Sequence, residues 1–98
     1  AGADRRRWRE FVPSLDLIEG GALLWVIVGD AARMERKYAL RGFRFLLLEA
    51  GHLMQNLCLL SATLRLCTLP LGGFFEAEIA RELQLPAGDT VLYAGACG

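Results

Sequence analysis

The chain has 98 residues, a length that corresponds to one domain or part of one and excludes two complete folds. Hydrophobic residues make up 54% of it and charged residues 22%, so it is not an acidic or basic disordered tail. Eleven basic and eleven acidic residues give no net charge, which argues against nucleic-acid or anionic-membrane binding through an overall field. Because so short a chain buries only about 60–68% of its unfolded surface, we expect exposed apolar surface that a second subunit or another segment covers.

The three cysteines and the single histidine do not form a metal-binding pattern. Cys58, Cys67 and Cys97 are odd in number, show no C-x-x-C spacing and lie in apolar sequence, which favours reduced, packed thiols in a cytoplasmic protein. His52 is the only histidine, so a His-rich zinc site is excluded. The sequence therefore predicts neither a disulfide framework nor a metal site.

The longest apolar stretch, residues 43–66, is interrupted by charged and polar side chains. Arg44, Glu49 and Arg65 lie within it, whereas a membrane span needs about 18–20 predominantly apolar residues. The first residues lack the basic segment and apolar run of a secretory signal. We therefore expect a cytoplasmic protein with no membrane-spanning helix.

Residues 1–20 are assigned to a poorly defined N-terminal segment and residues 21–98 to a second unit. The first segment is weakly helical, is interrupted by Pro13, and carries a basic cluster between Arg5 and Arg9 that is more typical of a solvated helix end than of an anion-binding arm. Residues 22–28 are apolar and rich in β-branched and aromatic side chains, which predicts a strand buried on both faces.

Asp30 is placed to cap a short helix that ends in Arg36-Lys37-Tyr38, and Gly42 is the next helix breaker. Residues 43–66 contain no proline and many helix formers, and predict a helix of about 36 Å at ~1.5 Å per residue. Apolar residues surround its axis, which predicts a central, buried helix. Its polar residues form a stripe that we expect to be hydrogen-bonded in the core or at an interface: Glu49, His52, Gln55 and Asn56.

The last third of the chain predicts two more strands and a short helix. Residues 67–71 contain Pro70, which suits an edge strand or an extended loop but not a central strand. An amphipathic helix at residues 76–83, with Ile79, Ala80 and Leu83 inward, and an apolar strand at residues 90–97 follow. The result is an α+β fold in which a long central helix packs on a small, mostly antiparallel sheet.

Two short motifs carry candidate chemistry. Gly72 and Gly73 remove two Cβ atoms, so the backbone can approach a flat ligand closely and present N–H groups to it. Lys37 and Tyr38 place an ammonium group beside a phenol, a candidate base for proton abstraction. By itself, each motif is more typical of an ordinary turn or a surface helix end.

Taken together, three segments resemble the C-terminal half of FMN-dependent oxidases of the nitroreductase superfamily. They are KYALRGFRF at residues 37–45, LEAGHLMQNL at residues 48–57 and LPLGGF at residues 69–74. The similarity covers about residues 20–98 and is greatest to the azoline-oxidising branch. That branch includes the thiazoline and oxazoline dehydrogenases of modified-peptide biosynthesis and the oxidase domains of nonribosomal peptide synthetases.

The resemblance implies an FMN-binding fold in which the long helix forms a dimer interface and the flavin lies between subunits. Pro70, Leu71, Gly72 and Gly73 match the loop that runs along one face of the flavin ring and offers a backbone N–H to its reactive nitrogen. Lys37 and Tyr38 match a Lys-Tyr pair in which the tyrosine removes a ring proton as hydride passes to FMN and the lysine assists. The polar residues of the long helix are assigned to structure or interface.

The family's N-terminal half, which carries an Arg-Arg-Ser type motif for the FMN phosphate, has no counterpart here, because Trp8 follows Arg5-Arg6-Arg7 where the motif has Ser. We therefore expect part of a split or fragmented oxidase that turns azolines into azoles in a peptidic substrate. It would need the missing half or a second chain, and would form a homo- or hetero-oligomer through the helix at residues 43–66. The other interpretations are a non-catalytic partner subunit or degenerate relative, and a generic NAD(P)H-dependent nitro or quinone reductase.

Overall fold

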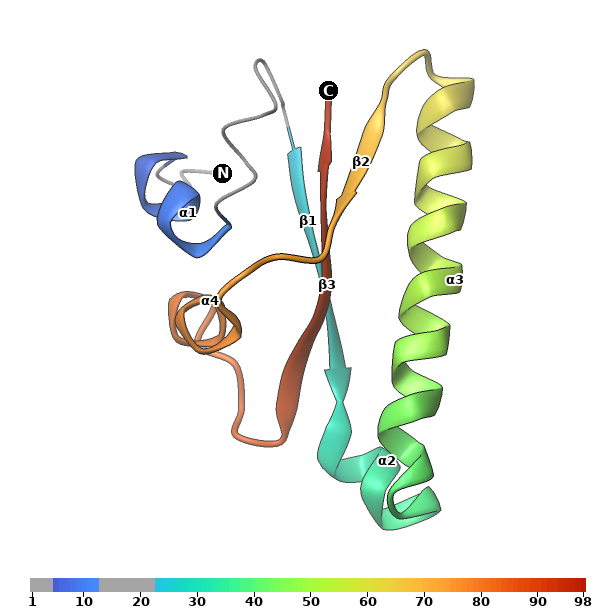
Figure 1. Cartoon of the computed structure of the whole chain (residues 1–98), viewed down its shortest axis with the longest axis vertical. Coiled ribbons are helices and arrows are strands. Elements are labelled where there is room, and N and C mark those ends of the chain that lie inside the picture. The colour runs from blue at the N-terminus through green and yellow to red at the C-terminus, as the bar shows by residue number, and fades with distance from the viewer. Residues whose placement is uncertain (1–4, 13–22) are drawn as a thin grey trace.

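The computed structural model describes residues 5–12 and 23–98. Four helices and three strands follow in the order α1 (Arg5–Phe11), β1 (Leu23–Asp30), α2 (Ala31–Tyr38), α3 (Arg41–Thr63), β2 (Thr68–Leu71), α4 (Glu76–Glu82) and β3 (Asp89–Cys97). The sheet lies between α3 on one side and α1 with α4 on the other (Figure 1). This arrangement confirms the predicted α+β fold with a long helix on a small sheet.

The sheet is antiparallel, with the strand order β1-β3-β2. β3 is therefore the central strand, and its Gly95 pairs with Trp25 of β1 and with Pro70 of β2. Pro70 lies in an edge strand, as predicted, because an edge strand does not need its missing N–H for a second ladder. The register between β1 and β3 shifts between Ile27 and Val28.

The main apolar core fills the space between the sheet and the two short helices. Trp8 and Phe11 of α1 meet edge to face with ring centroids 5.4 Å apart. The N–H of Phe75 donates to the carbonyl of Phe11 at 2.7 Å and joins α1 to the segment before α4. The buried members of this core come from α1 and the residue after it, β2, α4 and β3: Trp8, Phe11, Val12, Leu71, Ile79, Val91, Ala94 and Ala96.

The long helix contacts the opposite face of the sheet through a narrow stripe, namely Leu46, Ala50, Met54 and Ser61. The prediction of a helix buried all round is therefore wrong for this chain, because three strands cover only one side of it. β1 differs in the same direction: most of its residues are half-buried, not enclosed on both faces. By length and composition α3 is apolar enough to cross a membrane, although the sequence predicted no such helix. Only 22% of its most apolar window is buried, whereas a core helix of a soluble protein that passes the same test is mostly buried, and one such helix is weak evidence of a span.

The boundaries of the elements differ from the predicted ones at a few positions. α3 begins at Arg41, so Gly42 lies within it and is not a helix breaker. It ends at Thr63, three residues early, where Arg65 adopts a positive φ of 60° and the N–H of Leu66 donates to the carbonyl of Ser61. Leu83 follows α4 and is exposed, not inward. The predicted boundary at residue 20, and Pro13, lie outside the described residues.

Candidate functional site

Lys37 and Tyr38 form the last turn of α2, which is held at both ends. At its start, Asp30 Oδ1 accepts a hydrogen bond of 2.9 Å from the N–H of Arg33, as the sequence predicts. At its end, the N–H of Ala39 donates to the carbonyl of Glu35, with Ala39 in a conformation of φ 54° and ψ −136°. This φ is uncommon for a residue with a side chain, and it directs the chain back into α3.

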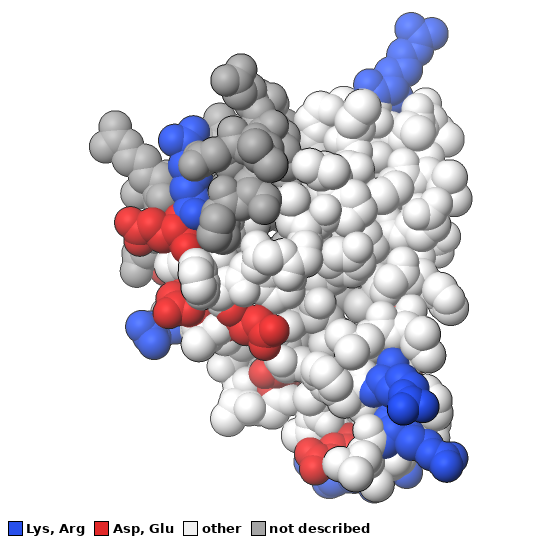
Figure 2. Space-filling view, viewed as in Figure 1, with Lys and Arg blue, Asp and Glu red and all other residues white. Residues whose placement is uncertain are grey.

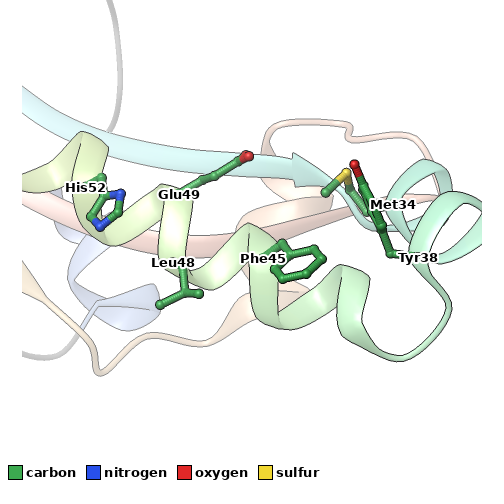
Figure 3. A pocket seen from close by; sticks show the side chains of 6 residues that line it. All are labelled: Met34, Tyr38, Phe45, Leu48, Glu49 and His52. Atoms are coloured by element: carbon green, nitrogen blue, oxygen red, sulfur yellow. The ribbon is translucent and has the colours of Figure 1, made fainter.

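Tyr38 opens onto a shallow hollow of about 280 Å³ between α2 and α3. Figure 3 shows Met34 and Tyr38 on one side and residues of α3 on the other. The rings of Tyr38 and Phe45 meet edge to face with centroids 5.1 Å apart, and Lys37 Nζ lies 5.2 Å from the Tyr38 ring centroid. The full lining consists of Met34, Tyr38, Phe45, Leu48, Glu49 and His52.

Glu49 and His52 belong to this hollow, although the sequence assigned them only to a structural stripe. Figure 3 shows the Glu49 side chain extending toward α2. The helical spacing of Phe45, Glu49 and His52 places them on neighbouring turns of α3, and this was visible in the sequence. The packing of α2 against this face of α3 depends on tertiary structure, so the sequence did not show it.

The expected hydrogen-bonded stripe is not formed within this chain. Glu49, His52, Gln55 and Asn56 are all exposed. Within residues 5–12 and 23–98, no side-chain hydrogen bond or ion pair involves any of the four.

The second predicted site, residues 70–73, is the exit from β2. Leu71 is 5% exposed and anchors this segment in the core, whereas Gly72 and Gly73 are exposed. A Cβ built on either glycine meets no atom within 4 Å, and neither has the positive φ that favours glycine. Among the described residues, no hydrogen bond uses the N–H of Gly72 or Gly73. Nothing in the described part of the chain therefore requires glycine at these two positions.

The geometry of this loop suits a flat ligand. Open space in front of two glycines lets a planar ligand approach the backbone, and two free N–H groups supply donors for its polar atoms. The buried Leu71 fixes the loop from behind. The missing Cβ atoms follow from residue type, whereas the open space and the unused N–H groups depend on the surrounding fold.

The structure does not bring the two predicted sites together in one chain. Tyr38 lines a hollow formed by α2 and α3 alone, and none of residues 70–73 takes part in it. Figure 1 shows α2 at one end of α3, whereas β2 ends near the middle of the molecule.

Cysteine and metal chemistry do not add to the site. Cys97 is buried and Cys58 half-buried, but Cys67 is exposed and so is not a packed thiol as predicted. All three are free thiols. Within the described ranges, no group of three or more His, Cys, Asp or Glu residues is placed to hold a metal ion.

Comparison with known proteins gives a family match over nearly the whole chain. The nitroreductase family profile matches residues 5–98, a range that includes α1. A protein of Methanocaldococcus jannaschii with the name "Putative nitroreductase MJ1384" is 35% identical over 63 residues. These residues are 64% of this chain and 32% of that protein, so the chain matches about a third of this relative's length.

Proposed function

The chain belongs to the nitroreductase family, and we propose that it supplies the C-terminal half of an FMN-dependent oxidoreductase. Family membership indicates oxidoreductase chemistry, and the α+β fold with a long helix on a small antiparallel sheet is the part of the resemblance that is confirmed. The reaction, the cofactor and the partners named below are our proposals for this chain.

The flavin contact is assigned to Pro70, Leu71, Gly72 and Gly73. The observation that carries this assignment is that Gly72 and Gly73 have open space at their Cβ positions and no positive φ, so the chain's own fold does not explain them. FMN, when bound, supplies the two-electron acceptor. The backbone of the loop would lie against the plane of the flavin ring, and its free N–H groups would donate hydrogen bonds to the polar atoms of the ring.

The proton-transfer role is assigned to Tyr38. Its ring is held by Phe45 and lies under the ammonium group of Lys37, while 40% of the residue remains exposed. An exposed phenol on a fixed ring is suited to take a proton from one carbon of the substrate ring as hydride leaves the neighbouring carbon for the flavin. Lys37, whose Nζ lies 5.2 Å from the centroid of the Tyr38 ring, is assigned to assist this step.

For the reaction itself, we propose oxidation of an azoline ring to an azole in a peptidic substrate. The Lys37-Tyr38 pair supports this choice, because a reductase of nitro compounds or quinones removes no proton from carbon. The name of the Methanocaldococcus jannaschii relative favours the second candidate, an NAD(P)H-dependent nitro or quinone reductase. Both use the same flavin loop.

The site is completed by a second polypeptide in this proposal. Tyr38 and the loop at residues 70–73 lie on separate parts of the chain, and apolar side chains of α3 are exposed. We therefore assign the region at residues 43–66 to pairing with a second copy or with the missing half. A cytoplasmic location is proposed with it, supported by the free cysteines and by the family, whose members are generally soluble.

A small exposed residue outside the loop and outside α3 allows a matched test. A Cβ at Gly72 would meet open space, and Ala87 is exposed in the turn before β3. The protein that contains this chain is titrated with FMN, and binding is followed by quenching of flavin fluorescence. We expect Gly72→Val to abolish binding and Ala87→Val to leave it unchanged. A protein that binds no FMN, or equal effects of the two substitutions, would refute the assignment.

Substrate addition then separates the two reactions. An azoline oxidase reduces its flavin on addition of a thiazoline peptide without NAD(P)H. A nitro or quinone reductase bleaches its flavin with NAD(P)H and reoxidises it with the nitro compound. If FMN is bound but neither reaction bleaches the flavin, the correct interpretation is the non-catalytic subunit.

A further inference from the structure

A cluster of exposed basic side chains covers the corner where α2 runs into α3. We call it the basic corner; its members are Arg33, Arg36, Lys37, Arg41 and Arg44. Glu35 is the sole acidic residue between positions 33 and 44, so four positive charges are in excess on a chain with no net charge. Figure 2 shows basic side chains gathered at this end of the molecule and acidic ones gathered near α4. Basic and acidic side chains are therefore partly separated on this face of the molecule.

The fold uses only part of these charges: Arg36 and Lys37 lie in the last turn of α2, where the helix dipole favours them. In the described part of the chain none of the four arginines forms an ion pair, and Lys37 contacts only the ring of Tyr38. Arg41 and Arg44 lie in the first turn of α3, which has no acidic residue, so the helix dipole opposes them. Like charges this close together also repel one another. The unfavourable dipole and the repulsion between like charges cost stability. We therefore consider a partner that neutralises these charges.

The apolar side chains within the corner define the kind of partner. Leu40, between the two helices, is 90% exposed, and Phe43 is 50% exposed. A small anion would neutralise the arginines and leave Leu40 in water. A polypeptide with both carboxylates and apolar side chains covers both, since interfaces combine an apolar centre with a polar rim. A nucleic-acid site is disfavoured because the acidic residues elsewhere on the chain leave no net positive charge.

We propose that the basic corner is a docking surface for an acidic segment of a polypeptide partner, with Leu40 buried at its centre. The surface adjoins Tyr38 through Lys37, but docking does not depend on the flavin reaction. Binding and turnover are therefore measured separately, and a failure of one does not decide the other.

The test uses fluorescence anisotropy of a short labelled peptide built from glutamate and leucine, titrated with the protein. The same peptide with glutamine in place of glutamate, and a single-stranded oligonucleotide of equal charge, serve as competing probes. We expect the glutamate peptide to bind most tightly. Its affinity should fall steeply with added salt, because salt screens exposed charge pairs.

Two double substitutions give the matched comparison. Arg41→Gln with Arg44→Gln should weaken peptide binding by about fivefold, in keeping with exposed ion pairs. Arg65→Gln with Arg81→Gln removes two equally exposed arginines elsewhere and should have no effect. Leu40→Ser should also weaken binding while circular dichroism stays unchanged. Equal binding of the glutamine peptide, equal effects of the two arginine pairs, or preferential binding of the oligonucleotide would overturn the proposal.

Discussion

Gly42 of α3 packs directly against the backbone carbonyl of Met34 in α2, so the two helices meet backbone to backbone. A Cβ at residue 42 would overlap that carbonyl, which has no side-chain freedom with which to move away. The contact sets the position of α2, and with it the position of Tyr38 beside Phe45. Glycine is required here for close approach, and not for its backbone conformation.

We predict that Gly42→Ala destabilises the fold by about 1–3 kcal/mol, because helices forced apart lose packing. The measurement is the free energy of unfolding in urea. Gly51→Ala is the control, since its Cβ would meet open space in the same helix. That change should stabilise by about 0.5–1 kcal/mol through helix propensity alone. Equal effects of the two substitutions would contradict the close approach.

The sequence predicted those features that depend on a single residue type. Pro70 allowed an edge strand or an extended loop but not a central strand, Asp30 preceded a helix it caps, and Gly72-Gly73 marked an open loop. Each was identified because the physical reason is local: a missing N–H, a carboxylate at a helix start, or a missing Cβ.

Features that depend on packing between elements were missed. Gly42 was interpreted as a helix breaker because a close approach to Met34 leaves no local signal. The neighbourhood of Glu49 and Tyr38 was missed for the same reason. The burial of α3 was overestimated. An apolar helix indicates that its surface is buried, but it does not show whether the residues that bury it belong to the same chain.

The cap on α2 gives a second prediction. Asp30→Ala removes the acceptor for the N–H of Arg33 and should cost about 1 kcal/mol of stability, as N-cap substitutions do. Asp30→Asn keeps an acceptor oxygen and should cost only a fraction of this. Thermal unfolding of the two variants decides the matter. An equal loss in both would mean that the charge, and not the hydrogen bond, is what stabilises the helix.

Met54 and Gly95 are predicted to be coupled across the interface between α3 and β3. A Cβ at Gly95 would lie 3.0 Å from the Sδ and Cε atoms of Met54, which is only 2% exposed. Met54→Ala should cost about 2–4 kcal/mol by leaving a cavity. Gly95→Ala alone should cost about 1 kcal/mol, because a flexible methionine yields.

The double substitution tests this coupling. The methyl group that Gly95→Ala adds would occupy space that Met54→Ala vacates, so the combined loss should fall short of the sum by at least about 0.5 kcal/mol, the lower limit for residues in contact. Urea unfolding of the four proteins gives the coupling energy. Additive losses would show that the two side chains do not compete for the same space.

Tyr38→Phe isolates the hydroxyl group of the proposed base. The substitution keeps the ring, so the contacts with Phe45 and Lys37 remain and the melting temperature should not change. We expect FMN binding to persist while azoline oxidation falls by at least about 100-fold, the usual range for loss of a general base. Tyr93→Phe on β3 is the matched control and should keep full activity. Unchanged oxidation by the Tyr38 variant would remove this residue from the mechanism.

The exposed apolar side of α3 predicts that the chain associates. Its exposed large side chains are Phe43, Phe45, Leu47, Leu48, Leu53, Leu59 and Leu60. Figure 2 shows a broad uncharged surface over α3 between basic side chains at its two ends. So large an apolar surface is rarely left in water by a monomer, and each buried leucine contributes about 1.5–3 kcal/mol to association.

Leu53 and Leu60 lie seven residues apart on one side of α3 and are 47% and 62% exposed. Leu53→Glu with Leu60→Glu should convert an oligomer to a monomer in sedimentation velocity, because burying two carboxylates at an apolar interface is unfavourable. Ala77→Glu with Leu83→Glu adds the same charge to exposed positions at α4 and should leave the oligomer intact. A parent chain that sediments as a monomer would contradict pairing through α3. A requirement for detergent would instead indicate that lipid covers this helix, since its length also suits a membrane span.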